Sequence, residues 1–342
     1  MLIRLLKHLY KIITKQERVL ISRYFPIGWL DKIKEIEPRK NEFVYKTIIS
    51  CSGCGFSGSS AVTDFLAEFD NCSAFGGVTD DEARGRSEAY EIDFFRDGVG
   101  IYALEKMLTS PIRRTHNAAI HDFVNTVWNN YMSKCPIYDE FYLSESKKFI
   151  KNLIDFEIPL PNGDKEYIPK CMNDKEFRAY ASKYIDNVFS NISSKDFLIL
   201  DQFLSLDYIP YLELDDYFKS YKIIFVWSDP RDMYIRSMNH KVSWVPKDAK
   251  AFVKYFHRRT EAYFDISNKH LLKISFDDLC YDYENTSKKI MKFLGLSEKQ
   301  HIKKLMYFNP EESRKNTRLW ETYPDKQTIQ YIYDNLKEYC IN

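Results

Sequence analysis

Short hydrophobic runs alternate along the chain with longer amphipathic stretches, a pattern typical of strands that alternate with helices. Four runs predict buried strands: YKTIIS at 45–50, FLIL at 197–200, KIIFVW at 222–227 and LLKISF at 271–276. Each run ends in polar or glycine-rich residues, and the first and last lead into helical periodicity. Strands connected in this way form a parallel sheet through right-handed crossovers. We therefore expect ligands at the carboxyl ends of these strands.

The hydrophobic pattern also divides the chain into regions. Residues 1–40 begin with leucines and isoleucines interleaved with Arg4, Lys7, Lys11, Lys15 and Arg18, which predicts a basic amphipathic helix. Such a helix either lies on an anionic membrane surface or packs on the protein with its basic face in water. Residues 41–342 form the predicted α/β domain, a P-loop-like parallel sheet flanked by helices. Residues 100–195 read as a largely helical insertion, interrupted by a turn signal at 159–164.

Charge and cysteine content exclude several classes of protein. Lys and Arg total 50 and Asp and Glu total 49, so the net charge of +1 gives no support for a nucleic-acid binder. The seven cysteines are odd in number and irregularly spaced, so they predict no disulfide framework. Cys51 and Cys54 form a C-x-x-C pair, which leaves a metal or redox role open, although no second pair follows at zinc-site spacing. The sequence contains no run of 18 apolar residues, so it predicts no membrane-spanning helix.

A run of small residues joins the first predicted strand to a helix. It reads Ser50-Cys51-Ser52-Gly53-Cys54-Gly55-Phe56-Ser57-Gly58-Ser59-Ser60. Small residues allow backbone N–H groups to converge on an anion, and the N-terminus of the following helix adds partial positive charge. The loop differs from a Walker A motif because it contains no lysine and lacks the Gly-Lys-Ser/Thr ending. We interpret it as a phosphate-binding loop, with a plain tight turn as the alternative.

Four segments in sequence order resemble the sulfotransferase family, whose members use 3′-phosphoadenosine 5′-phosphosulfate (PAPS). The S-G-S-S sequence that opens a helix is similar to the family's 5′-phosphosulfate loop. Residues 225–237, which contain FVWSDPRD followed by Arg236 and Ser237, resemble the element that holds the 3′-phosphate. ISFDDL at 274–279, leading to FLGL at 293–296, resembles a late strand and helix. SRKN at 313–316, ahead of Trp320, resembles the basic loop that closes over the nucleotide.

The resemblance implies a PAPS-dependent sulfotransferase that requires no metal. The residues it assigns to PAPS binding are Gly55, Phe56, Ser57, Gly58, Ser59, Ser60, Arg231, Arg236, Ser237, Arg314, Lys315 and Asn316. The chain departs from the family pattern twice. Phe56 stands where the family usually has Lys or Arg, and Ser228 stands where it usually has Arg. Other cations would then be needed: Arg84, Arg86 or Arg96 for the first position, and Arg231 or Arg236 for the second.

Transfer to a hydroxyl requires a general base near the loop. In family members that use glutamate the base follows the loop by a few tens of residues, which favours Glu91, then Glu88. His116 and His121 are the alternatives. The alternative is that these carboxylates face solvent and these histidines only pack against neighbouring residues.

Polar and aromatic residues near the strand ends are further candidates. Asp201 and Gln202 end a strand and would either contact phosphates and acceptor or cap a turn. Trp244 and Trp320 would stack on adenine or a sugar, or belong to the core.

The acceptor is expected to be a hydroxyl of a bacterial surface polysaccharide or lipid-linked sugar, modified in the cytoplasm. Peripheral membrane contact would be made through the N-terminal helix. Two other functions stay open: an atypical P-loop kinase, and a degenerate nucleotide-binding protein without transfer activity.

Overall fold

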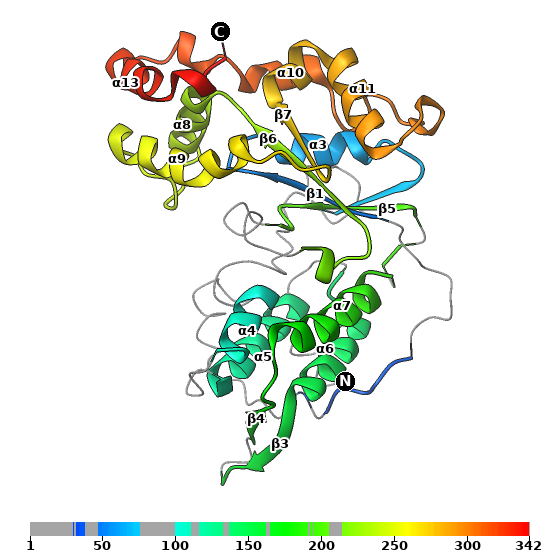
Figure 1. The fold of residues 1–342 in the computed structure, drawn as a ribbon. Coiled ribbons are helices and arrows are strands. Elements are labelled where there is room, and N and C mark those ends of the chain that lie inside the picture. The colour runs from blue at the N-terminus through cyan, green and yellow to red at the C-terminus, as the bar shows by residue number, and fades with distance from the viewer. Residues whose placement is uncertain are drawn as a thin grey trace. The chain divides into compact units, whose positions relative to one another are not determined.

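A computed structural model describes residues 30, 32–37, 47–75, 100–110, 116–132, 137–161, 165–190, 192–193, 195–204 and 214–341 (Figure 1). The chain divides into two compact units. The first comprises Met1–Tyr45, Phe94–Ser194 and Glu213–Lys219, and the second comprises Lys46–Asp93, Lys195–Leu212 and Ser220–Asn342. The predicted N-terminal helix lies outside the described residues. No helix within the described part of the chain is long and apolar enough to cross a membrane.

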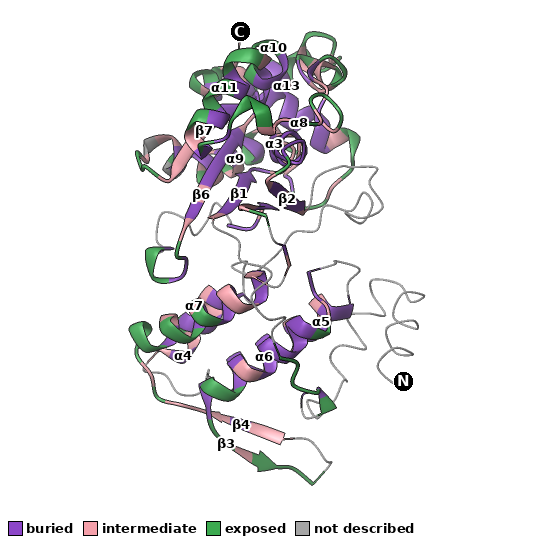
Figure 2. Cartoon of the chain, turned by 90° about the vertical axis from the view of Figure 1, so that its right-hand side faces the viewer, coloured by how far each residue is buried: buried purple, intermediate pink, exposed green. Residues whose placement is uncertain are grey.

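The second unit is built on a five-stranded parallel sheet. Its strands are β1 (Thr47–Gly53), β2 (Cys72–Phe75), β5 (Phe197–Asp201), β6 (Tyr221–Trp227) and β7 (Leu271–Ser275). They lie in the order β2-β5-β1-β6-β7, and every pair is parallel. β1 and β6 are almost entirely buried (Figure 2), as their continuous apolar runs require in a sheet covered on both faces. The predicted α/β class with a parallel sheet is confirmed.

Helices cover the two faces of this sheet because neighbouring strand residues point to opposite sides. Ile224 and Val226 face a core shared with α3 (Ser59–Leu66) and α11 (Tyr283–Leu294). Phe225 faces a second core, formed with α8 (Pro230–Asn239), α9 (Ala249–Asp265) and α13 (Lys326–Leu336). In Figure 1, α8, α9 and α13 gather at the left of the sheet and α11 at the right. Short helices complete this unit: α10 (Phe276–Tyr281), α12 (Pro310–Ser313) and the 3₁₀ helices η6 (Glu298–Gln300), η7 (Arg314–Asn316), η8 (Leu319–Glu321) and η9 (Lys337–Tyr339).

In its described residues, the first unit is mainly helical. It contains α4 (Ile101–Leu108), α5 (His116–Met132), α6 (Glu140–Leu153), α7 (Asp174–Ser190), the 3₁₀ helix η5 (Leu214–Asp216) and an antiparallel hairpin of β3 (Ile154–Pro159) and β4 (Lys165–Pro169). Aromatic rings fill its core, where Phe149 of α6 stacks on Tyr184 of α7 at 4.5 Å between ring centroids. The buried Glu105 of α4 accepts a hydrogen bond from Arg178 Nε of α7 at 3.0 Å. This ion pair joins the two helices.

Candidate functional site

The loop between β1 and α3 presents several backbone N–H groups that have no acceptor within the described residues. They belong to Gly55, Phe56, Gly58, Ser59 and Ser60. The loop closes on itself where Ser57 N donates to Cys54 O at 2.9 Å, and Ser59 begins α3. Convergent free amides at a helix N-terminus form an anion site, because their dipoles and that of the helix point positive charge at the same place. The loop thus places unbonded amides at the N-terminus of α3, and phosphate binding there stays a prediction.

Two glycines make this loop conformation accessible. Gly58 has φ +94°, and a Cβ atom there would lie 2.5 Å from Phe276 Cδ2. A Cβ atom on Gly53 would lie 1.9 Å from Ser57 Oγ. Ser57 Oγ is buried and has no hydrogen-bond partner within the described part of the chain. The small residues of the loop are therefore required by close packing as well as by backbone angle.

The carboxyl end of β5 contacts the loop through two polar side chains. Ser60 Oγ donates to Asp201 Oδ2 at 2.7 Å, and Gln202 Nε2 donates to Ser59 Oγ at 2.6 Å. Gln202 has a left-handed φ of 57°, a conformation that is uncommon for residues other than glycine. Because β5 is the immediate neighbour of β1, these groups lie at the sheet edge where parallel α/β folds bind ligands.

An aromatic stack occupies the position where a loop cation was expected. Phe56 has a φ of 65°, and its ring stacks on His240 at 5.2 Å and on Trp244 at 5.7 Å between centroids. Trp244 is 53% exposed and lies against Gly55, where a Cβ atom would come within 1.8 Å of its ring. Trp244, predicted to stack on a ligand or to belong to the core, therefore lies over the outside of the loop.

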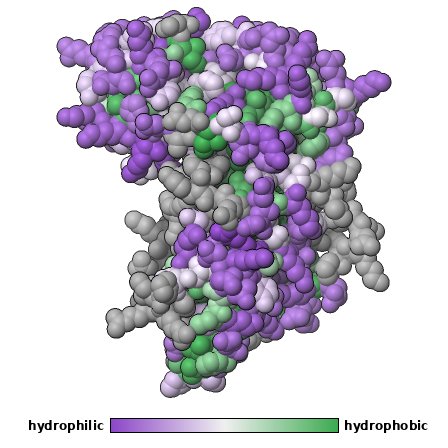
Figure 3. Space-filling view, viewed as in Figure 1, coloured by the Kyte–Doolittle hydropathy of each residue, from purple (hydrophilic) through white to green (hydrophobic). Residues whose placement is uncertain are grey.

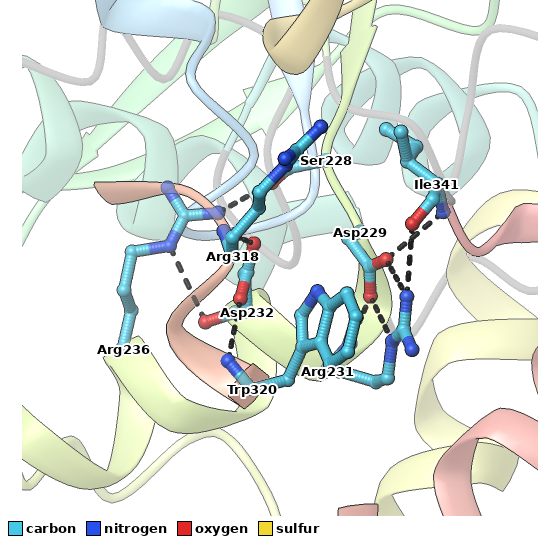
Figure 4. A network of polar contacts seen from close by, with 8 residues as sticks. All are labelled: Ser228, Asp229, Arg231, Asp232, Arg236, Arg318, Trp320 and Ile341. Carbon is cyan, nitrogen blue, oxygen red and sulfur yellow. Dashed lines mark hydrogen bonds and ion pairs between the residues drawn. The ribbon is translucent and has the colours of Figure 1, made fainter. Parts of the chain in front are cut away.

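A network of charged groups surrounds the N-terminus of α8 (Figure 4). Asp229 caps the helix and accepts hydrogen bonds from Arg231 Nε at 3.0 Å and Arg231 Nη2 at 2.6 Å. The same guanidinium donates to Ile341 O at 2.9 Å and lies 3.9 Å from the centroid of the Trp320 ring. These contacts connect α8 to the C-terminal residues and engage Arg231 in an ion pair with Asp229. Its role at the nucleotide stays a prediction.

Arg236 places a second guanidinium at the carboxyl end of β6. Its Nη2 donates to Ser228 Oγ at 2.6 Å, and its Nε donates to Asp232 O at 3.3 Å. Ser228 follows β6, and Val226 pairs in register with Gly53 at the start of the loop. Arg236 thus brings a guanidinium to the Ser228 hydroxyl, and whether it replaces the expected cation at the nucleotide stays a prediction. The hydroxyl of Ser237, predicted to bind PAPS, donates to Tyr234 O at 2.6 Å.

Buried carboxylates beside Arg236 have perturbed protonation. Burial, together with the charge of Asp229, raises the pKa of Asp232 to about 7. The same two causes raise the pKa of Asp277 to about 6. Asp232 accepts backbone N–H groups from Arg318 at 2.7 Å and Trp320 at 3.3 Å, so it holds the C-terminal loop against α8. A clustered set of perturbed groups is a recognised mark of a functional site.

The basic C-terminal loop gathers around one tyrosine ring. Arg314 and Arg318 lie 4.9 and 4.8 Å from the centroid of Tyr281. Arg314 also pairs with Glu311 at 2.6 Å, whereas Lys315 is exposed and Asn316 is half-buried. Arg318, which sequence reasoning did not select, has a left-handed φ of 53°. Its signal in the sequence was its place in the basic run just ahead of Trp320.

The favoured candidates for the catalytic base lie in a part of the chain that the structure does not describe. Glu88 and Glu91 lie outside the described residues, as do Arg84, Arg86, Arg96 and the side chain of His116. His121 belongs to α5 of the first unit, where its ring lies 6.0 Å from that of Tyr167. The identity of the base stays a prediction.

The C-x-x-C pair lies at the start of the loop. Cys51 and Cys54 are buried free thiols, and burial raises the pKa of Cys51 above its usual value. Within the described residues no group of three or more metal-ligating side chains comes together. Cys51 contributes to the core that α3 and α11 share.

Neither family models nor curated proteins match this chain. Among solved structures, the sulfotransferase domain from the curacin biosynthetic pathway matches with 13% identity and a TM-score of 0.39, covering 87% of this chain and 99% of its own. The sulfotransferase domain of the Synechococcus PCC 7002 olefin synthase matches with 12% identity and a TM-score of 0.39, covering 90% and 100%. Retinol dehydratase, solved with androsterone and the inactive cofactor PAP, matches with 16% identity and a TM-score of 0.36, covering 88% and 84%. Likeness at this level establishes neither family nor activity.

Proposed function

We propose that this chain is a sulfotransferase that moves a sulfuryl group from PAPS to a hydroxyl of a carbohydrate or glycolipid. The observation that carries the proposal is the set of free backbone amides at Gly55, Phe56 and Gly58 through Ser60, at the N-terminus of α3. Such a loop binds a phosphate or sulfate ester without a side-chain cation. The absence of the Walker lysine favours a donor other than ATP.

The second anion of the donor, its 3′-phosphate, would be held at the carboxyl end of β6. Arg236 and Ser228 lie there, and the Arg318 backbone is tied to Asp232 one turn before Arg236. Arginine is suited to this role because its planar donors match phosphate oxygens in pairs. Arg314, Lys315 and Asn316 would form the loop that closes over the nucleotide, as predicted from the sequence. This two-anion arrangement favours a 3′,5′-bisphosphate over a simple nucleotide.

The reaction would be an in-line displacement. The acceptor oxygen forms a bond to sulfur, the bond between sulfur and the phosphate oxygen breaks, and adenosine 3′,5′-bisphosphate (PAP) leaves. The hydroxyl proton passes to a general base, for which we propose Glu91, with Glu88 as the alternative. Catalysis would rest on positioning and on amide stabilisation of the leaving phosphate. The acceptor class, the cytoplasmic location and membrane contact by the N-terminal segment belong to the same proposal.

The decisive experiment measures PAP binding by calorimetry and sulfate transfer from labelled PAPS to a panel of sugars and glycolipids. We expect micromolar or tighter binding together with transfer. Binding without transfer to any acceptor would favour the degenerate nucleotide-binding protein. Lack of PAP binding at micromolar concentration would refute the proposal. Glu91→Gln is expected to retain PAP affinity and abolish transfer, and unchanged turnover would exclude Glu91 as the base.

One observation favours a second candidate function, phosphoryl transfer by an atypical P-loop kinase. Ser60 opens α3 and its hydroxyl is bonded to Asp201 at the end of the adjacent strand β5. A serine and an aspartate in these positions hold Mg²⁺ in P-loop enzymes. Magnesium-dependent ATP binding that exceeds PAP affinity, and that is lost in Asp201→Asn, would establish this alternative.

A further inference from the structure

The segment between α11 and α12 exposes three large apolar side chains. In residues 299–306, hereafter the 299–306 loop, Ile302 is 61% exposed, Leu305 45% and Met306 65%. The loop is part of the orange segment that follows α11 in Figure 1. Most of the molecular face drawn in Figure 3 is hydrophilic. A group of exposed apolar residues of this size is of the kind that marks an interaction surface.

The loop is held in this conformation by a buried carboxylate. Glu68, which is fully buried, accepts hydrogen bonds from His301 Nε2 at 2.6 Å and from the backbone N–H groups of Leu305, Tyr307 and Phe308 at 3.1, 2.9 and 3.0 Å. The imidazole of His301 also stacks on Phe69 at 4.4 Å between centroids. These four hydrogen bonds to one carboxylate fix the base of the loop. The apolar tips are thus presented by a defined structure.

Leu305 combines a strained backbone conformation with an exposed side chain. Leu305 has a left-handed φ of 63°, a conformation that costs about 1 kcal/mol or more for residues other than glycine. Leu305 N nevertheless reaches Glu68, while its side chain remains in solvent. Strain maintained by surrounding bonds at an exposed apolar residue points to a functional surface, because folding alone would favour burial of the leucine.

The charges around these residues identify the kind of partner. Lys299 is exposed, and Lys304 is exposed and pairs with Glu284 across 3.3 Å at the surface. Lys303 lies between the apolar residues and donates to the Tyr307 hydroxyl at 2.8 Å. Lysine is depleted at protein interfaces, whereas aromatic residues and arginine are enriched there. Lysines interleaved with aliphatic side chains instead suit an anionic bilayer. The apolar tips enter the acyl boundary while the ammonium groups remain at the headgroups.

We propose that the 299–306 loop is a docking site for anionic membrane surfaces. Ile302, Leu305 and Met306 insert into the interface, and Lys299, Lys303 and Lys304 contact lipid phosphates. The Glu68 network holds the loop in the inserting conformation. This proposal is independent of the sulfotransferase activity and of the N-terminal segment.

The test is co-sedimentation of the full chain with large vesicles of phosphatidylcholine, with and without about one third phosphatidylglycerol. Ile302→Ser/Met306→Ser is expected to reduce partitioning onto anionic vesicles about tenfold or more. Lys299→Gln/Lys304→Gln is expected to reduce it by about fivefold for each lysine, an effect that salt should remove. Tyr331→Ser, which alters an exposed apolar residue on α13, is the control and should bind as the wild type does.

All these variants retain the N-terminal segment, so its contribution to binding is constant. The free energy of unfolding of each loop variant should equal that of the wild type, because the substituted side chains lie in solvent. Equal partitioning of wild type and Ile302→Ser/Met306→Ser would overturn the proposal and place any membrane contact elsewhere. Failure of the wild type to bind either vesicle would also overturn it and leave the loop as a surface for a protein partner. PAP binding, measured in parallel, reports on the proposed activity separately.

Discussion

The loop between β1 and α3 and the α8 network carry their positive charge in two different physical forms. The loop uses backbone N–H groups and the dipole of α3, and the ring of Phe56 takes the place of a loop cation. The α8 network instead concentrates full charges, with Arg231 and Arg236 among Asp229, Asp232 and Asp277. Backbone dipoles are fixed by the fold and do not titrate. Buried side-chain charges depend on one another and on pH. The two regions should therefore fail in different ways when they are altered.

The largest effect is expected from Arg231→Met in the α8 network. Asp229 is 1% exposed and accepts two bonds from the Arg231 side chain. Removing the guanidinium leaves a buried carboxylate without its counter-charge, which should lower the free energy of unfolding by about 3–5 kcal/mol. Urea denaturation measures this change. Glu311→Gln, which removes the exposed pair with Arg314, is the matched control and should cost less than about 1 kcal/mol. An equal loss of unfolding free energy in the two variants would contradict the difference between the buried and the exposed ion pair.

Gly58→Ala should affect the loop more than the fold. Its Cβ atom would meet Phe276 at 2.5 Å in a backbone conformation of φ +94°. The amides would shift, and we expect PAP affinity to fall about a hundredfold, measured by calorimetry. Gly295→Ala is the matched control, because Gly295 also has a positive φ, +73°, but has no atom near its Cβ position. It should cost about 1 kcal/mol of stability and leave PAP affinity unchanged.

Phe56→Lys tests whether the loop binds a phosphate through its backbone amides alone, without a side-chain cation. Phe56 already has a left-handed φ, so lysine adds no new backbone strain. A charge-assisted bond to a bound phosphate, offset by the lost ring stacking, should tighten PAP binding about tenfold. The gain should shrink as salt rises. Phe56→Met, which removes the ring without adding charge, serves as the comparison. An unchanged affinity in Phe56→Lys would mean that a phosphate does not bind near position 56.

The α8 network should also show a pH dependence of stability, which the backbone amides of the loop should not. The pKa of Asp232 is raised from 3.8 to about 7, so between these values the folded state binds a proton that the unfolded state releases. The free energy of unfolding contributed by Asp232 therefore falls as pH rises through this window. Asp232→Asn should gain stability relative to the wild type as pH rises from about 5 to about 7. A constant difference between the two proteins across that range would contradict the raised pKa.

Four of the five sheet strands and the place of the loop were predictable from the sequence, whereas β2 was not among the predicted strands. Continuous apolar runs such as FLIL and KIIFVW predict strands buried on both faces, and the small residues after YKTIIS predict a turn that opens a helix. These are local properties, because periodicity and backbone freedom depend on near neighbours in the chain. The predicted fold class followed from them.

The electrostatics of the site depended on contacts between distant residues. Arg236 reaches back along α8 to Ser228, and Arg231 is occupied by Asp229 and by the carbonyl of Ile341, 110 residues away. Glu68 likewise contacts Tyr307 and Phe308 only in the folded chain. The sequence by itself determined which residue types were present and which segments formed the sheet and the loop. The tertiary structure decided which charges are paired and which backbone groups are free, because pairing depends on distances that local patterns do not encode.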